Sequence, residues 1–525
     1  MSAGIPWRTF GARRTFGAPL SFPFRGAKPV SILRPSPADG MIREGSEKTP
    51  AQTVGSVSRN RVHGRESMKI TFCGAAGTIT GSSHRVETNG LQILLDCGLF
   101  QGGREIDERN RAPFAFDAAG LDAVLLSHAH LDHAGLLPRL VRDGFRGRIL
   151  CTAPTADIAK LMLADSAHLQ VEEAAYQARK AKRRGEVGAP PLYDMDDVLR
   201  TADLFHPVSG YGVPTDLGKG LSCVFHDAGH ILGSACIELR TSNGRLLYSG
   251  DLGNRHRPIV RDPATPPLAD VVLVESTYGD RRHRSIADSV VELRGAIHDV
   301  IPGGGNLLIP SFALERTQEV LYEVFLLWTR GDLPRCRIYL DSPLATSTTR
   351  VFERFPEFFD DEGQKVFSRR PNPFEFPLLH YTQTTDESKE INAQPGGNVI
   401  IAGSGMCTGG RILHHLRHNL WNADAGIVFV GYQAVGTLGR RIVDGARSVR
   451  LFGEEIAVRA KVWTVNGFSS HADQPILMDW IGKARPRDVF LVHGESDSQS
   501  ALQSKIQSEL GVTPRIPAWR ETVTV

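Results

Sequence analysis

The chain lacks several features that would place it in a specialised class of protein. No run of 18 or more apolar residues occurs in its 525 residues, so no segment is predicted to cross a membrane. Its seven cysteines are odd in number and form no CxxC pair, which is typical of reduced, buried thiols in an intracellular protein. The glycine fingerprint of a dinucleotide-binding fold is absent as well. With 41% hydrophobic and 23% charged residues, the composition is that of a soluble globular protein.

The first 67 residues differ from the rest of the chain. They hold eleven Lys and Arg against four Asp and Glu, many Pro and Gly, and no sustained periodicity, so we expect them to be disordered. We interpret them as an overextended start ahead of Met68 and expect the protein to be cytoplasmic and of bacterial type; a genuine presequence would instead indicate an organelle. The net charge of the whole chain is +3 and that of this segment is +7, so the net charge of residues 68–525 is −4. Residues 68–525 are therefore not basic overall.

The segment SHAHLDHAG, residues 127–135, is the strongest chemical signal in the chain. It follows the apolar run LDAVLL, which predicts a buried strand. His128 and His130 are two residues apart in an extended segment and point to the same side, while Asp132 and His133 open a helical pattern. Imidazole and carboxylate without thiolate suit Zn²⁺ better than manganese or iron. The alternative is a loop of surface histidines with a capping aspartate.

Three further donors stand where apolar runs end. His230 follows a strand-like stretch, Asp251 follows RLLYSG, and His493 follows VFLV. A two-metal site needs more donors than one loop supplies, and loops at the edge of a sheet commonly build such sites. Each residue alone could equally be structural. Together they predict a site for two metal ions.

Four of these motifs, in order, resemble the metallo-β-lactamase superfamily: Asp96 in LLDCG, the HAHLDH segment, His230 and Asp251. Three more resemble the β-CASP nucleases, namely Glu275 in VESTYGDR, His471 in FSSHAD and His493 in LVHGE. A histidine at the last position is typical of the RNA-processing branch. The similarity covers residues 68–525.

The resemblance implies an αββα sandwich at 68–280, an inserted α/β β-CASP domain at 281–455, and a return to the sandwich at 456–525, which would include the strand WTVNG. It also implies two Zn²⁺ per chain, with Mn²⁺ as the alternative. Asp251 would bridge the ions, and Asp96 would orient a ligand imidazole. One ion would be held by His128, His130 and His230, the other by Asp132, His133 and His493.

The expected chemistry is attack on phosphorus by a hydroxide shared between two metal ions. The leaving ribose oxygen needs an acid, and His471 is our candidate, with Glu275 fixing its tautomer as the family pattern implies. Without the resemblance, Glu275 could be a solvated strand-end carboxylate and His471 an ordinary residue at a helix start. Ser469 could reach the scissile phosphate or cap that helix.

Two turns of the insert favour phosphate binding, because their helix N-termini offer free amides. They lie in IPSFALERTQ and AGSGMCTGGRILHHLRH. Arg316 and Arg411 would add charge, and Ser404 and Gly405 would line the second turn. The alternative is that these glycines only permit a tight turn.

Single-stranded RNA is the expected substrate, cleaved to 5′-phosphate and 3′-hydroxyl ends, because a single strand enters a cleft between two domains more easily than a duplex. Endonuclease and 5′-exonuclease modes both fit. The same zinc fold also hosts small ester and thioester hydrolases, and some β-CASP relatives are silent RNA-binding scaffolds. No membrane partner is expected. A homodimer is compatible with the sequence.

Overall fold

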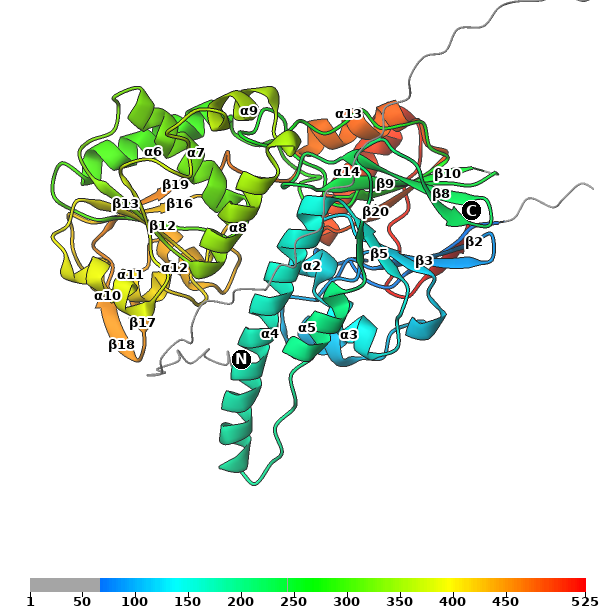
Figure 1. The fold of residues 1–525 in the computed structure, drawn as a ribbon, viewed down its shortest axis with the longest axis horizontal. Coiled ribbons are helices and arrows are strands. Elements are labelled where there is room, and N and C mark those ends of the chain that lie inside the picture. The colour runs from blue at the N-terminus through cyan, green and yellow to red at the C-terminus, as the bar shows by residue number, and fades with distance from the viewer. Residues whose placement is uncertain (1–66, 243) are drawn as a thin grey trace, which may run out of the picture.

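Two bodies lie side by side in the computed structural model, a two-sheet sandwich and an inserted three-layer domain (Figure 1). The structure describes residues 67–242 and 244–525. The expectation of disorder for the leader therefore falls outside the described residues, except for residue 67. Within the described residues, no helix is both long and apolar enough to cross a bilayer.

The sandwich is built from two mixed sheets. The first has seven strands, in the order β21 (Thr522–Thr524), β1 (Lys69–Phe72), β2 (His84–Thr88), β3 (Leu91–Leu95), β4 (Ala123–Leu125), β5 (Arg148–Cys151) and β6 (Phe205–Pro207). The second has six, in the order β20 (Asp488–Val492), β11 (Val271–Glu275), β10 (Arg245–Tyr248), β9 (Ala235–Arg240), β8 (Leu221–Asp227) and β7 (Thr215–Gly218).

Alternating side chains explain how these sheets stack. In β3, Ile93 and Leu95 face the second sheet, where Phe225 and Ile237 join the same core, while Leu94 faces the helices outside. Helices cover both outer faces, which confirms the αββα class. They are α1 (Arg104–Glu108), α2 (Leu131–Ala134), α3 (Leu137–Arg142), α4 (Ala153–Lys182) and α5 (Met195–Ala202) on one side, and α13 (Gln474–Ala484) and α14 (Ser496–Leu510) on the other.

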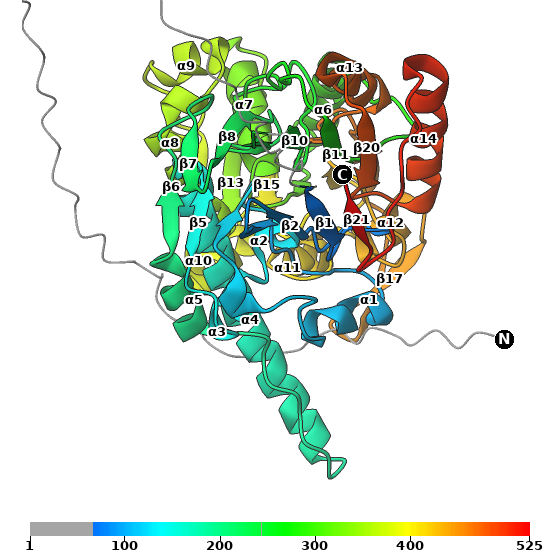
Figure 2. The ribbon, with the colours of Figure 1, turned by 90° about the vertical axis from the view of Figure 1, so that its right-hand side faces the viewer.

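Helix α4 is 30 residues long. Its first half packs on the sandwich through buried residues such as Ile158 and Leu163, and Thr152 caps its N-terminus by accepting from the amide of Thr155. Its second half carries Arg179, Lys180 and Lys182 and projects beyond the sheets (Figure 2). The predicted helical region at 153–205 is thus two helices joined by an extended return.

The insert is a wholly parallel sheet with helices on both faces, as expected for an α/β domain. The strand order is β14 (Leu379–Tyr381), β13 (Arg337–Asp341), β15 (Asn398–Ala402), β12 (Leu307–Pro310), β16 (Gly426–Phe429) and β19 (Lys461–Thr464). The helices are α6 (Ile286–Val300), α7 (Arg316–Thr329), α8 (Pro343–Arg354), α9 (Asp361–Phe367), α10 (Thr385–Ala393), α11 (Ile412–Asn419) and α12 (Leu438–Val443). Short elements complete the described chain: the hairpin β17 (Ser448–Leu451) and β18 (Glu454–Ala457), and 3₁₀ turns at Arg109–Arg111, Ala118–Gly120 and Pro356–Phe358.

One strand lies in the other body from the one predicted. The sequence placed WTVNG with the sandwich, yet β19 pairs in parallel with β16, with Lys461 opposite Gly426 and Thr464 opposite Phe429. The insert's sheet thus extends past residue 455. Hydrophobic periodicity identifies a strand but not its partner, which is why the pattern alone assigned it to the wrong sheet.

Candidate metal and catalytic centre

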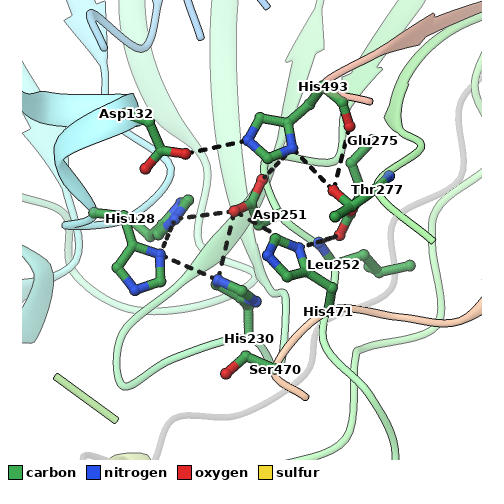
Figure 3. Close-up of polar contacts among 12 residues, drawn as sticks. His128, Asp132, His230, Asp251, Leu252, Glu275, Thr277, Ser470, His471 and His493 are labelled. Carbon is green, nitrogen blue, oxygen red and sulfur yellow. Dashed lines mark hydrogen bonds and ion pairs between the residues drawn. The ribbon is translucent and has the colours of Figure 1, made fainter. Parts of the chain in front are cut away.

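Seven predicted metal donors converge at one end of the sandwich; Asp132 and His133 lie in α2, and the other five lie in loops that leave buried strands. Asp251 lies at the centre, between two groups of side chains (Figure 3). Its Oδ2 is 3.4 Å from His128 Nε2 and 3.5 Å from His230 Nε2. Its Oδ1 is 3.1 Å from His133 Nε2 and 3.6 Å from His493 Nδ1. The two carboxylate oxygens therefore face different groups, which is the arrangement a bridging ligand needs.

The remaining donors complete each group. His130 Nδ1 lies 3.0 Å from His128 Nε2 and 3.3 Å from His230 Nε2, so three imidazole nitrogens point at one another. Asp132 Oδ2 lies 3.3 Å from His493 Nε2. Three ring nitrogens converging in this way cannot all hydrogen-bond to each other, and Asp251 Oδ1 has no hydrogen-bond donor. Nitrogen and oxygen donors in this arrangement fit divalent cations.

Burial keeps the first group of imidazoles neutral. Burial, followed by the charge of His128, lowers the pKa of His130 to about 3. Burial and the nearby His471 lower the pKa of His230 well below its usual range. A neutral imidazole has a free lone pair, which is the form that binds a metal ion.

Asp96 organises the site without facing the centre. Its carboxylate accepts hydrogen bonds from the amide and hydroxyl of Ser127, from the hydroxyl of Tyr248 and from His133 Nδ1, all at 2.7 Å. Because His133 donates through Nδ1, its Nε2 is left to face Asp251. This is the orienting contact expected from a carboxylate behind a ligand histidine.

Close backbone packing brings the ligand loops together. A Cβ at Gly98 would lie 1.6 Å from the carbonyl oxygen of Asp132, and one at Gly253 would lie 1.9 Å from that of Gly229, next to His230. Only glycine fits at either point. The glycines of LDCG and GDLG therefore set the spacing of the loops that carry the donors.

Glu275 and His471 form a hydrogen-bonded pair beside the metal donors (Figure 3). Glu275 Oε1 accepts from the amide of Leu252 at 2.8 Å and from His471 Nδ1 at 3.2 Å. Glu275 is fully buried, so the alternative of a solvated carboxylate is excluded. Burial lowers the pKa of His471, but the charges of Glu275 and Asp251 and the hydrogen bond that His471 donates to Glu275 outweigh burial and raise this pKa to about 9.

The predicted substrate-binding residues lie in different surroundings. Ser469 hydrogen-bonds to Tyr278, whose ring is 6.0 Å from that of His471, and the cap of α13 is Asp473 rather than Ser469. Arg316 is buried at the start of α7 with its Nη2 3.5 Å from Ser470 Oγ. Sequence reasoning did not single out Tyr278, although it follows Glu275 at the end of the same strand.

The second predicted turn is largely occupied by its own contacts. Ser404 Oγ accepts from the amides of Thr408 and Gly409, at 3.0 and 3.2 Å, so the hydroxyl fills part of the cradle that an anion would use. The Arg411 guanidinium lies 2.6 Å from buried Asp341 and donates to the carbonyl of Gln383. Arg411 is therefore held inside the insert and does not face the metal donors.

A buried ion pair that the sequence did not indicate joins the insert to this site. Arg257, in the loop after Asp251, lies 2.5 Å from Glu319 in the first turn of α7, and both side chains are fully buried. Arg257 Nη1 also donates to the carbonyl of His230 at 2.6 Å. The pair thus links a ligand loop of the sandwich to a helix of the insert.

Replacing Arg257 with alanine should lower the free energy of unfolding by about 3 kcal/mol, because buried Glu319 would keep only Arg316, 3.5 Å away, as a counter-charge. Chemical denaturation followed by circular dichroism measures this change. Arg487→Ala is the matched control, since Arg487 pairs with Asp488 at the surface and its loss should cost under about 1 kcal/mol. Equal effects of the two substitutions would show that the buried pair does not stabilise the fold.

Comparison with known proteins agrees with this geometry. Residues 85–262 match a family model described as metallo-beta-lactamase superfamily domain, residues 317–442 a Beta-Casp domain, and residues 455–517 a Zn-dependent metallo-hydrolase RNA specificity domain. Fold and site together therefore define a metal-dependent hydrolase of the metallo-β-lactamase class.

Two relatives place the chain more closely. It is 44% identical over 436 residues to Ribonuclease TTHA0252 of Thermus thermophilus, covering 83% of this chain and 95% of that protein. It is 30% identical over 494 residues to Transcription termination factor FttA of Methanothermobacter thermautotrophicus, and the match covers 89% of this chain and 74% of that protein. The chain belongs to the β-CASP nucleases of the metallo-β-lactamase superfamily.

A solved structure is similar in fold only. A protein of unknown function from Enterococcus faecalis superposes with a TM-score of 0.52 at 12% identity, covering 87% of this chain and all of that one.

Proposed function

We propose that the protein is a zinc-dependent ribonuclease that hydrolyses phosphodiester bonds of single-stranded RNA and leaves 5′-phosphate and 3′-hydroxyl ends. The observation that carries this proposal is the Glu275–His471 pair, set beside a carboxylate that two groups of metal donors share. The RNA specificity model at residues 455–517 and the ribonuclease relative support RNA as the substrate.

In this proposal each donor group would hold one divalent cation, and Asp251, which lies between the two groups, would contribute an oxygen to each site. Two bound cations would lower the pKa of a coordinated water and neutralise charge developing on the phosphoryl oxygens. The protein supplies the proton for the leaving group. His471 Nδ1 bonds to Glu275, so Nε2 is the nitrogen that would deliver a proton to the leaving 3′ oxygen.

Arg316 is the proposed contact to the scissile phosphate. Its Nε has no hydrogen-bond partner although the side chain is buried, and its Nη2 reaches Ser470, next to His471. A buried guanidinium with an unused donor can be satisfied by a phosphate oxygen. Ser469, held by Tyr278, borders the same position, while Arg411, Ser404 and Gly405 would shape the adjacent turn of the insert.

The decisive experiment incubates single-stranded RNA, labelled at its 3′ end, with metal-free protein, with the same protein reloaded with Zn²⁺ or Mn²⁺, and with the loaded His471→Ala variant. We expect about two Zn²⁺ per chain by mass spectrometry and cleavage only by the loaded, unsubstituted protein. Internal fragments from the first time point would identify an endonuclease, and 5′ mononucleotides an exonuclease.

Two results would contradict the proposed function. A loaded protein that leaves RNA intact but turns over a chromogenic ester would overturn the proposal and leave an esterase on the same scaffold. Cleavage that survives removal of metal would overturn the assigned role of the donor groups.

A further inference from the structure

Several loops of the insert lie at one edge of its sheet, where the carboxyl ends of the strands are. All five pairings in this sheet are parallel, so the loops that follow β12, β15, β16 and β19 leave from the same side. Phe312 follows β12, Tyr432 follows β16, and the chain leaving β19 runs into His471. Ligands of open parallel sheets bind outside this edge.

Two aromatic rings at this edge are open to solvent. Among the described residues, three Phe, Trp or Tyr side chains are exposed: Phe312 at 44%, Tyr432 at 51% and Trp421 at 57%. Trp421 lies at the opposite edge, between α11 and the start of β16. Two of the three exposed rings are thus on the side of the sheet that leads to His471.

These two rings are held in place by the turn after β15. A Cβ on Gly405 would lie 2.8 Å from the ring of Phe312, so the ring rests against the Gly405 backbone and glycine is needed there. Gln433 Nε2 donates to the carbonyl of Gly405 at 3.0 Å, which ties the loop carrying Tyr432 to the same turn. Both rings are therefore exposed, and the turn that contains Gly405 contacts the Phe312 ring and the loop that carries Tyr432.

The segment that carries Phe312 also reaches the residues beside His471. The Thr317 hydroxyl donates to the carbonyl of Phe312 at 2.6 Å. Arg316, the residue before Thr317, lies 3.5 Å from the hydroxyl of Ser470, the neighbour of His471. Phe312 is thus connected to the catalytic pair through the first turn of α7.

We propose that Phe312 and Tyr432 form a stacking platform for unpaired nucleobases of the RNA, next to the position of the scissile phosphate. This inference rests on the proposed function and adds the surface that holds the bases. A ring face accepts any base, so recognition through these rings tolerates changes in RNA sequence. Bases in a duplex are already stacked on each other, so the platform favours single strands.

The test measures binding separately from cleavage. Fluorescence anisotropy is recorded in the His471→Ala background, with an oligoadenylate and with an abasic ribose-phosphate chain of equal length. Phe312→Ala and Tyr432→Ala should each weaken oligoadenylate binding about tenfold, while Tyr432→Phe and the control Trp421→Ala bind like the background protein. The abasic chain should bind weakly to the background protein, and neither alanine variant should weaken it further.

Two results would overturn the platform: oligoadenylate affinities of Phe312→Ala and Tyr432→Ala that match Trp421→Ala, or an equal loss of affinity for the abasic chain. Circular dichroism checks that the variants fold. If Phe312→Ala does not fold, Tyr432→Ala and the comparison of the two ligands in the background protein still decide the question. Failure of the unsubstituted enzyme to cleave RNA would count against the proposed function alone, because the binding assay does not depend on cleavage.

Discussion

Alanine at position 471 will slow RNA cleavage by about 100-fold or more while both groups of metal donors keep their ions. The reason is that His471 Nδ1 bonds to Glu275, 3.2 Å away, in a pair whose charges raise the pKa of the imidazole to about 9. Under the proposed function, the variant lacks the group that delivers a proton to the leaving oxygen. Single-turnover cleavage rates and metal content by mass spectrometry test the two halves of this prediction.

A histidine of similar environment serves as the control. His226 lies 2.9 Å from Glu238 in a partly buried pair on the second sheet, away from the donor groups. Glu238 is also bound by Arg240, so His226→Ala should keep both cleavage and metal content. Loss of metal from His471→Ala would contradict the division of roles, because it would make His471 a ligand.

The second large effect is expected at the centre of the site. Asp251→Asn removes the charge that both donor groups share, so we expect metal content to fall well below that of the unsubstituted protein and cleavage to drop by about 1,000-fold or more. The amide has nearly the shape of the carboxylate, so the fold should survive. Metal titration by calorimetry, with thermal unfolding of the metal-free proteins, measures both.

Asp227→Asn is the matched substitution. Burial raises the pKa of Asp227 to about 7, so this carboxyl is already partly neutral at physiological pH. Its Oδ1 accepts from the amide of Gly229, a contact that asparagine can keep. If Asp251→Asn kept its metal and its activity as well as Asp227→Asn does, the bridging role of Asp251 would be disproved.

Much of the site could be predicted because its donors obey a local rule. Asp96 and His493 directly follow apolar strands, Glu275 is the last residue of another, and His128 comes three residues after the end of β4; apolar runs of this kind are visible in sequence. Their convergence could not be derived from spacing: Asp132 and His493 are 361 residues apart yet their side chains lie 3.3 Å from each other. For that step the order of the family's motifs was needed.

The features that the sequence did not predict depend on which residues or strands pair in the folded chain, and local sequence patterns do not show such pairings. Arg411 has the sequence context of a phosphate ligand, but Asp341, 70 residues earlier, holds its guanidinium. The Arg257–Glu319 pair joins two segments with no motif in common. Strand β19 shows an ordinary strand pattern, and only its pairing with β16 assigns it to the insert.

The position of β19 in the insert's sheet means that His471 is connected to both bodies of the protein. Only six residues separate Thr464, the last residue of β19, from His471, and the far side of His471 is pinned to the sandwich by a β-bridge to Gly253 and by the Ala472 amide on Leu252. His471 is therefore attached to both bodies: a six-residue segment connects it to the insert's sheet, and backbone contacts hold it to the sandwich. We expect a rotation of one body against the other to move the imidazole of His471 relative to the metal donors, so that substitutions which change the orientation of the two bodies also change the rate of cleavage.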